Sequence, residues 1–340
     1  MAYVVGLALL RRGGSRRVVA ALAVAIQLTP LAAPLLLSSD AYTYWFYAKV
    51  ARGGGNPYRD EPREFANIAG YEWVGARWHG QTSAYGPAFT LASEPLAGAT
   101  RNVAAWAYKG AAALAMLVVV ALALRHSVFA AAFVGWNPVL AVHLAGGGHN
   151  DAWVIALVLA ALALGAAAHR HAAGAAWAVA IFVKWIPLVL LPLRALEARA
   201  TGRRVGHLGF AVTAVVLAAA ATWRYGTGWL GAATPLLRNA ETSTGYSLPH
   251  RVEQLGLPHA LALSLFGAAF AVAYLWLLRE AWRGRARLGL AAAALLVCSP
   301  YVVVWYLAWV VPLAAVEEDR TARLVALALT AYLLPQTIPV

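Results

Sequence analysis

Long apolar runs separated by short polar segments recur along the whole chain, and they predict an all-helical protein that crosses a membrane many times. The first run extends from Val18 to Leu37, and as a helix its 20 residues would span about 30 Å, the thickness of a hydrocarbon core. Residues Ala2–Leu10 are apolar but too short to span, so we expect them at the membrane interface. Further single spans are predicted near 103–124, 128–145, 152–168, 207–223, 259–278 and 323–338.

Two more apolar segments, 172–193 and 288–316, each admit two interpretations. A single helix through 172–193 would hold Lys184 at mid-membrane, at a cost of about 3 kcal/mol, and would place the arginines that follow it outside. Two short helices that meet near Lys184-Trp-Ile-Pro187 keep those arginines inside, and Pro187 favours the break. We prefer this hairpin and a second one around Pro300, which brings the total to about 11 spans.

Clustered arginines set the expected orientation, because positive charge favours cytoplasmic loops. Arg11, Arg12, Arg16 and Arg17 precede the first span and place the N-terminus in the cytoplasm. Two long loops then face the extracytoplasmic side, 38–102 and 224–258, and the first is predicted to carry short surface helices at about 41–52 and 86–98. We expect one transmembrane domain over residues 1–340, located in the plasma membrane.

The composition supports a membrane protein and argues against other classes. Hydrophobic residues make up 62% of the 340 residues and charged residues only 12%, about half of what soluble domains carry. The net charge of +13 could suggest a nucleic-acid partner, but most of the arginines lie in short loops between apolar runs, so we expect none. The single cysteine, Cys298, excludes an intramolecular disulfide.

Rare ionisable residues at the outer ends of the predicted spans are the candidates for chemistry, because charged groups at membrane depth are costly and tend to mark substrate paths. A carboxylate can act as a general base toward a hydroxyl, cations can hold a phosphate, and aromatic rings can stack on sugars. The candidates are Asp40, Tyr44, Tyr85, His149, Asp151, Lys184, Arg224, Arg238, His250, Arg251, Trp305 and Tyr306.

Each candidate also has a purely structural interpretation. Asp151 could cap the span that it opens, and Lys184 could snorkel toward the interface. The loop arginines could bind lipid headgroups, and the aromatic residues could belong to the interfacial belt. A metal site formed by Asp40, His149 and Asp151 is conceivable, although no ligand spacing supports it.

Several short motifs occur in a consistent order. They are Asp40-Ala-Tyr-Thr-Tyr-Trp-Phe-Tyr-Ala-Lys49, Gly53-Gly-Gly-Asn-Pro-Tyr58, Ala84-Tyr-Gly-Pro87, Trp136-Asn-Pro138, Gly147-Gly-His-Asn-Asp151, Val183-Lys-Trp-Ile-Pro187, and Pro300 with Trp305-Tyr-Leu-Ala-Trp309. Together they resemble the GT-C superfamily of integral-membrane glycosyltransferases. The later motifs resemble the actinobacterial polyprenol-phosphate-mannose-dependent mannosyltransferases, which are similar to glycosyltransferase family 87.

The resemblance implies a GT-C fold with an extracytoplasmic cavity and a polyprenyl-phosphate sugar, with mannose favoured, as donor. It places the general base on Asp40, a cavity-lining acid on Asp151 and the phosphate-binding lysine on Lys184. The family usually inverts the anomeric centre and usually needs no metal, so no cofactor is expected.

Taken together, the sequence predicts transfer of a sugar to a hydroxyl of an extracytoplasmic glycolipid or glycan. We expect the donor phosphate to be held by Lys184 with one or more of Arg224, Arg238 and Arg251. Sugar and acceptor are expected to contact Tyr44, Tyr85, His149, Asp151, His250, Trp305 and Tyr306. The alternatives are a transporter or flippase for a charged lipid or sugar, for which we find no internal repeat, and a non-catalytic membrane scaffold.

Overall fold

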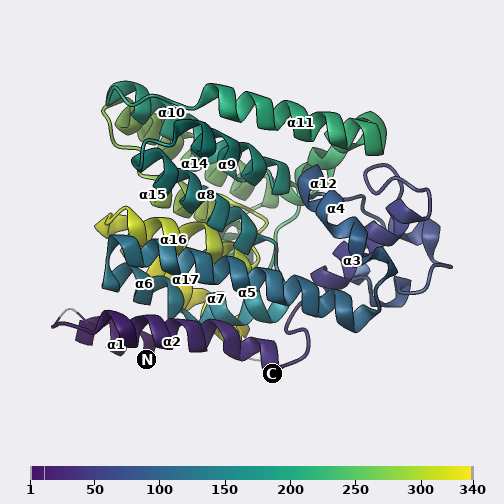
Figure 1. Cartoon of the computed structure of the whole chain (residues 1–340), viewed down its shortest axis with the longest axis horizontal. Coiled ribbons are helices and arrows are strands. Elements are labelled where there is room, and N and C mark those ends of the chain that lie inside the picture. Colours follow the sequence, from purple (N-terminus) through teal and green to yellow (C-terminus); the bar gives the residue numbers. More distant parts are fainter. Residues whose placement is uncertain (1, 11, 338–340) are drawn as a thin grey trace.

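The computed structural model describes residues 2–10 and 12–337. These residues are built from helices, turns and loops, and none of them forms a β-strand. Figure 1 shows the longer helices lying side by side as a bundle, with the segment around α3 and α4 gathered at one end. The predicted all-α fold class is therefore confirmed.

The first apolar run does not form one continuous helix. α1 is Ala2–Leu10, α2 is Arg16–Leu28, and a 3₁₀ turn, η1, follows at Thr29–Ala32. Pro30 and Pro34 lack the N–H that a continuing helix would need, so the chain leaves the helix here. The helix expected across 18–37 is therefore wrong in its outer part.

A buried lysine fastens this interruption to the bundle. Lys109 lies in α5 (Arg101–His126) and is 1% exposed, and its Nζ donates to the backbone oxygens of Pro30 at 3.0 Å, of Pro34 at 3.1 Å and of Ala33. Three acceptors satisfy the three ammonium protons, which makes burial of the charge tolerable. A lysine near the end of a predicted span could instead snorkel to the interface, but the Lys109 side chain points inward.

The first long loop folds into a compact unit around α3 (Asp40–Arg52). Most residues of α3 are buried, so it is the core of this unit and not the surface helix that we expected. The second helix expected in the loop is confirmed as α4 (Pro87–Ser93), which continues into η5 (Glu94–Gly98). Three short 3₁₀ turns lie between them: η2 (Pro62–Phe65), η3 (Tyr71–Trp73) and η4 (Ala76–Trp78).

A bent segment and a straight helix follow α5. α6 (Val128–Gly135), α7 (Pro138–Leu140) and a π-helical turn, η6 (Ala141–Gly146), form a pair bent by 49°. Pro138 begins the second part, and the Asn137 side chain caps it by accepting two backbone N–H groups. α8 (Asp151–Ala166) then opens after a turn that holds two glycines.

The two predicted hairpin breaks are present. α9 ends at Val183 and α10 begins at Pro187, so Lys184 sits in the break. In the later segment α15 ends at Cys298, and the chain resumes with the 3₁₀ turn η8 and then α16. The helices concerned are α9 (Arg170–Val183), α10 (Pro187–Ala200), α15 (Leu288–Cys298), η8 (Val304–Tyr306) and α16 (Leu307–Val316).

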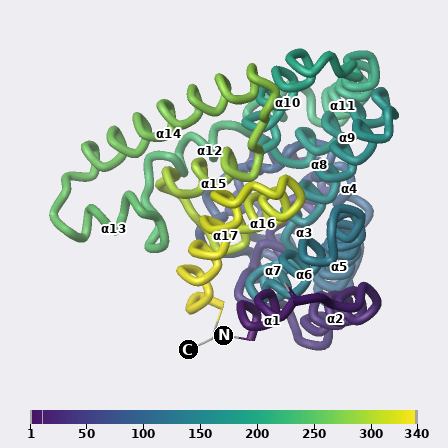
Figure 2. The backbone as a smooth tube through the Cα atoms, turned by 90° about the vertical axis from the view of Figure 1, so that its left-hand side faces the viewer, coloured from purple at the N-terminus to yellow at the C-terminus, as the bar shows by residue number. Residues whose placement is uncertain are grey.

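The second long loop also carries helices, and α13 and α14 lie at one edge of the molecule (Figure 2). The remaining elements are α11 (His207–Tyr225), η7 (Gly226–Ala233), α12 (Thr234–Ala240), α13 (Leu248–Gln254), α14 (His259–Trp282), α17 (Arg320–Leu333) and η9 (Leu334–Thr337). The last residue of the span predicted at 323–338 lies outside the described residues.

Several long apolar helices suggest a membrane location. Within the described residues, three helices are long and apolar enough to cross a membrane, or four if the bent pair counts as one span. They are Arg101–His126, His207–Ala240, His259–Trp282 and the pair Val128–Gly135 with Pro138–Gly146. Four shorter apolar helices of 10–17 residues accompany them. The total of about 11 spans therefore stays a prediction.

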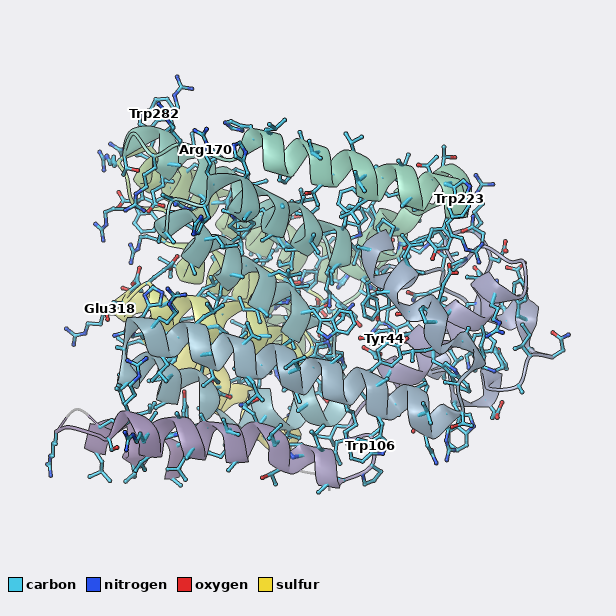
Figure 3. All side chains as sticks on the ribbon, viewed as in Figure 1. Tyr44, Trp106, Arg170, Trp223, Trp282 and Glu318 are labelled. Carbon is cyan, nitrogen blue, oxygen red and sulfur yellow. The ribbon has the colours of Figure 1, made fainter. Side chains whose placement is uncertain are left out.

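Segments that the sequence assigned to the same membrane side lie at the same end of the bundle. Figure 3 shows Arg170, Trp282 and Glu318, all expected inside, at one end. Tyr44 and Trp223, both expected near the outer side, lie toward the other end. The fold thus gathers the two long loops at one end, where the candidate residues are found.

Candidate active site

Asp40 opens α3 and is held in a defined orientation. It is 8% exposed, and its backbone N–H donates to Ser38 Oγ at 3.1 Å. The Trp78 indole Nε1 donates to Asp40 Oδ1 at 3.1 Å, and His149 Nδ1 lies 3.5 Å from Oδ2. One carboxylate oxygen is therefore fixed by a hydrogen bond, while the other has a longer, weaker neighbour and can accept a proton.

His149 is held by stacking and not by hydrogen bonds. It is fully buried, and its ring lies 3.8 Å from that of Trp305 at 15°. Neither ring nitrogen has a hydrogen-bond partner among the described residues. Gly148 before it has φ +70, and an added Cβ would lie 3.4 Å from the Ala41 Cβ, so this turn needs glycine to approach α3.

A buried ion pair between Asp151 and Lys184 lies near Asp40. Asp151, the first residue of α8, is fully buried, and Lys184 Nζ donates to its two oxygens at 2.8 and 2.9 Å. The Trp309 indole Nε1 donates to Oδ1 at 2.7 Å. Lys184 Nζ also lies 5.1 Å from the Tyr306 ring centroid. Three hydrogen bonds from two donor groups satisfy the carboxylate, and the pair as a whole carries no net charge.

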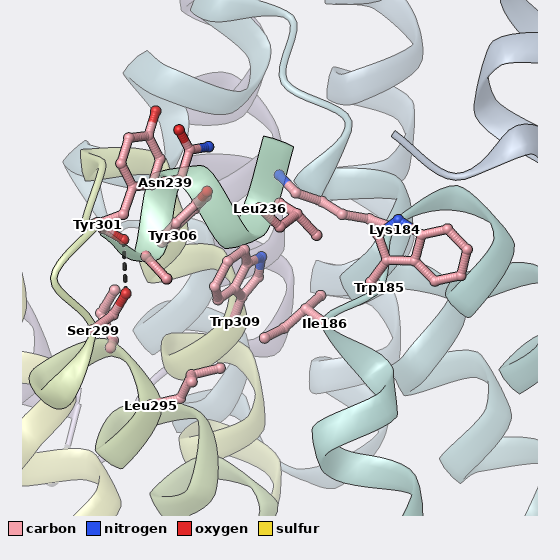
Figure 4. A pocket seen from close by; sticks show the side chains of 12 residues that line it. Lys184, Trp185, Ile186, Leu236, Asn239, Leu295, Ser299, Tyr301, Tyr306 and Trp309 are labelled. Carbon is pink, nitrogen blue, oxygen red and sulfur yellow. Dashed lines mark hydrogen bonds between the residues drawn. The ribbon is translucent and has the colours of Figure 1, made fainter. Parts of the chain in front are cut away.

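Two cavities meet at these residues. The larger, of about 270 Å³, runs along Lys184 and an apolar wall that includes Trp185, Leu236 and Leu295 (Figure 4). The smaller, of about 30 Å³, is lined by Asp40 and Trp78. Both cavities are bordered by the same five residues: Lys184, Leu236, Asn239, Tyr301 and Tyr306.

This arrangement brings Asp40 and Lys184, far apart in the chain, to one cavity. The larger cavity is slightly below the range of about 300–1,000 Å³ that is typical of small-molecule sites. The smaller one has room for about one water molecule. A hexose next to Asp40 would therefore require the aromatic walls or α12 to move.

Aromatic side chains form most of the remaining wall. Tyr85, Trp305 and Tyr306 line the small cavity, whereas Tyr44 supports Tyr85 from behind with ring centroids 4.8 Å apart. Burial raises the pKa of Tyr85 well above its ordinary value, and the nearby Tyr44 and Asp40 raise it further. The Tyr85 hydroxyl therefore stays protonated at neutral pH and can donate a hydrogen bond.

The structure does not bring Arg224 to the cavities. Its Nε pairs with the Glu94 carboxylate at 3.0 Å, and its Nη2 donates to the backbone oxygen of Ala51 at 2.6 Å. The hydroxyl of Tyr225 donates to the same glutamate at 2.6 Å. Arg224 thus joins α11 to the first loop unit.

Three other predicted residues also lie away from both cavities. Arg251 Nε donates to the Tyr332 hydroxyl at 3.0 Å, and His250 Nδ1 lies 3.2 Å from Glu253. Arg238 is exposed on α12, whereas Leu236 and Asn239 of the same helix line the cavities. These three side chains are therefore poor candidates for direct contact with a ligand in the cavities.

Sequence reasoning missed the residues that orient the acids. Trp78 and Trp309 each donate an indole N–H to a buried carboxylate. Arg77, next to Trp78, donates from Nη2 to Asn239 Oδ1 at 2.9 Å and stacks 4.3 Å from the Tyr301 ring. The sequence could have indicated such residues in general, because a buried carboxylate needs hydrogen-bond donors and tryptophan supplies an uncharged one.

The conceivable metal site does not assemble. Among the described residues, no three His, Cys, Asp or Glu side chains come together in a way that could hold a metal ion. Asp40 and His149 approach each other, but Asp151 is committed to Lys184. What the residues can supply is a general base, a cation and an aromatic, largely apolar wall.

Family models match most of the chain. The model described as alpha-(1→6)-mannopyranosyltransferase, N-terminal domain, matches residues 2–199. The model described as MptB C-terminal domain matches residues 250–339. No curated protein and no solved structure matches the chain.

Proposed function

The chain belongs to the alpha-(1→6)-mannopyranosyltransferase family and is thus a hexosyltransferase, and from this premise we propose that it transfers mannose from a polyprenyl-phosphate donor to an acceptor hydroxyl. The acceptor is an extracytoplasmic glycolipid or glycan. The observation that carries the proposal is that an oriented acid, Asp40, and a cation, Lys184, line one aromatic cavity. A transport function finds no comparable support in the family match.

Asp40 acts as the general base. Trp78 fixes one carboxylate oxygen, and the other takes the proton of the acceptor hydroxyl as that oxygen attacks the anomeric carbon. The bond from that carbon to the phosphate oxygen breaks, and the electron pair leaves with the polyprenyl phosphate. Lys184, held by Asp151, faces the departing phosphate. Tyr85, Trp305 and Tyr306 surround the sugar, whereas His149, which lines neither cavity, supports Trp305 and Asp40 from behind.

A single displacement inverts the anomeric centre, because the acceptor attacks opposite the leaving group. Asp40 borders the small cavity but not the large one, whereas Lys184 borders both, and this spacing suits such an in-line geometry. Since the family name specifies an alpha product, inversion requires a donor with the beta configuration. The anomeric proton couplings of donor and product, measured by NMR, test this step.

We also propose how the chain crosses the membrane. Residues 1–340 form one GT-C-type transmembrane domain of about 11 spans in the plasma membrane, with a cytoplasmic N-terminus and the cavity open to the extracytoplasmic side. The short hairpin helices complete the count beyond the long helices. Single cysteines introduced at exposed positions of 38–102 and 224–258, after replacement of Cys298, should all react with a membrane-impermeant reagent from outside.

Asp40→Asn tests the central role. The variant should insert, keep its thermal midpoint and bind donor, but its turnover should fall by about 10²- to 10⁴-fold. Transfer is followed with radiolabelled polyprenyl-phosphate mannose and candidate glycolipid acceptors. Glu72→Gln, an exposed acid of the same loop, is the control and should transfer normally. Near-normal turnover of Asp40→Asn would remove Asp40 from the mechanism.

A further inference from the structure

The charges around the two cavities leave one cation without a carboxylate. Lys184 is neutralised by Asp151 at 2.8 and 2.9 Å. Arg224 is paired with Glu94 elsewhere in the fold. Arg77 forms no ion pair within the described part of the chain, so its full positive charge remains available.

Arg77 is an exposed residue that lines neither cavity itself but contacts two residues that line both. Its Nη2 donates to Asn239 Oδ1 at 2.9 Å, and its guanidinium lies 4.3 Å from the Tyr301 ring centroid. Asn239 and Tyr301 line both cavities. The next residue, Trp78, holds Asp40, so a single 3₁₀ turn, η4, carries both this cation and the donor to the acid.

The contacts that hold Arg77 can be exchanged at little cost. The Asn239 side chain is a neutral amide, and a neutral hydrogen bond is weaker than a charge-assisted bond to phosphate. The Tyr301 ring supports the flat face of the guanidinium and leaves its N–H groups free to turn. An arginine paired with a carboxylate, such as Arg224, would first have to give up that pair.

We propose that Arg77 binds the phosphate of the lipid-linked donor and, after transfer, of the polyprenyl phosphate product. This inference rests on the proposed function. The planar fork of guanidinium N–H groups matches two phosphate oxygens, and Asn239 is the neutral partner that phosphate replaces. Lys184 lines both cavities and Arg77 contacts two of their lining residues, so the two cations approach the phosphate from different elements.

Two ligands that differ only in the phosphate, undecaprenyl phosphate and undecaprenol, test whether Arg77 contacts the phosphate itself. Their Kd values are measured in detergent for the wild type, Arg77→Gln and Arg101→Gln. Arg101 is the matched control, since it stacks 3.9 Å from the Trp73 ring near the same loop, but neither Trp73 nor Asn102, its hydrogen-bond partner, lines either cavity. Thermal midpoints of the three proteins report whether the fold is intact.

We expect Arg77→Gln to raise the Kd for undecaprenyl phosphate by about 10- to 100-fold and to leave the Kd for undecaprenol unchanged. Arg101→Gln should change neither value by more than about twofold. Arg77→Lys should recover part of the affinity, because it restores the charge without the fork.

Two results overturn the assignment while the proposed function stands. Equal weakening of both ligands would show that Arg77 only ties the first loop to α12. Unchanged binding of the phosphate would show that no contact forms. If instead the wild type does not prefer undecaprenyl phosphate over undecaprenol, the donor class itself is wrong and the assignment of Arg77 fails with it.

Discussion

Because Lys184 and Asp151 form a buried ion pair, we expect that the stability lost on removing Lys184 is restored when Asp151 is also neutralised, whereas the lost activity is not. Lys184→Met removes two of the three hydrogen bonds to a fully buried carboxylate and leaves only the Trp309 indole as donor. Removing one partner of such a pair costs about 3–5 kcal/mol of unfolding free energy. Asp151→Asn should cost less, about 1–2 kcal/mol, because the amide oxygen still accepts a hydrogen bond.

The double variant Lys184→Met/Asp151→Asn removes both charges together. Its stability should therefore lie close to that of Asp151→Asn alone, which corresponds to a coupling energy of about 3–5 kcal/mol. Its turnover should nevertheless stay at least about 10²-fold below that of the wild type, because no cation then faces the leaving phosphate from this side.

Chemical unfolding in detergent measures the stabilities, and transfer of radiolabelled mannose measures the activities. The pair Glu280 and Arg283, at the end of α14 with Arg283 57% exposed, is the control and should show a coupling of only about 0.3–0.5 kcal/mol. Additive losses in the double variant would refute the coupling. Recovery of turnover together with stability would show that Lys184 has only a structural role.

Two further substitutions test how the fold positions the site. Gly86→Ala would place a Cβ 2.1 Å from the Phe182 carbonyl oxygen, beside the break that holds Lys184, so initial transfer rates should fall at least tenfold. Gly110→Ala, with nothing within 4 Å, should be neutral or stabilising by up to about 1 kcal/mol. Lys109→Met removes three hydrogen bonds to backbone oxygens of the segment after α2, one of them buried, and should lower the unfolding free energy by about 3 kcal/mol. In thermal melts Lys49→Met, which removes a cation near the Trp45 ring, should have a much smaller effect.

Features with a local cause could be predicted from the sequence. The break at Lys184 follows from Pro187 together with the arginines after it, and the structure ends α9 at Val183. The start of a helix at Asp40 follows from the end of an apolar run. The interruption after Leu28 had an equally local signal in Pro30, but the continuous hydropathy of the run concealed it.

The donors to the acids could not be predicted in this way, because their contacts are long-range. Trp78 lies 38 residues from Asp40, and Trp309 lies 158 residues from Asp151. No periodicity distinguishes these two indoles from the other aromatic residues of the loops and hairpins. Only the fold shows which of them faces a carboxylate.

The sequence also does not show which of the loop arginines is able to bind a phosphate. Arg77 and Arg224 both belong to the long outer loops by sequence, so charge and position give them equal claim to a phosphate. What separates them is the neighbour: a carboxylate, Glu94, for Arg224, and a neutral amide, Asn239, for Arg77. Arg224 would have to break its ion pair with Glu94 before it could bind a phosphate, whereas Arg77, held by neutral groups, gains a charge-assisted bond at little cost. The ability of an arginine to bind an anion is therefore a property of its tertiary partners, and counting loop arginines cannot reveal it.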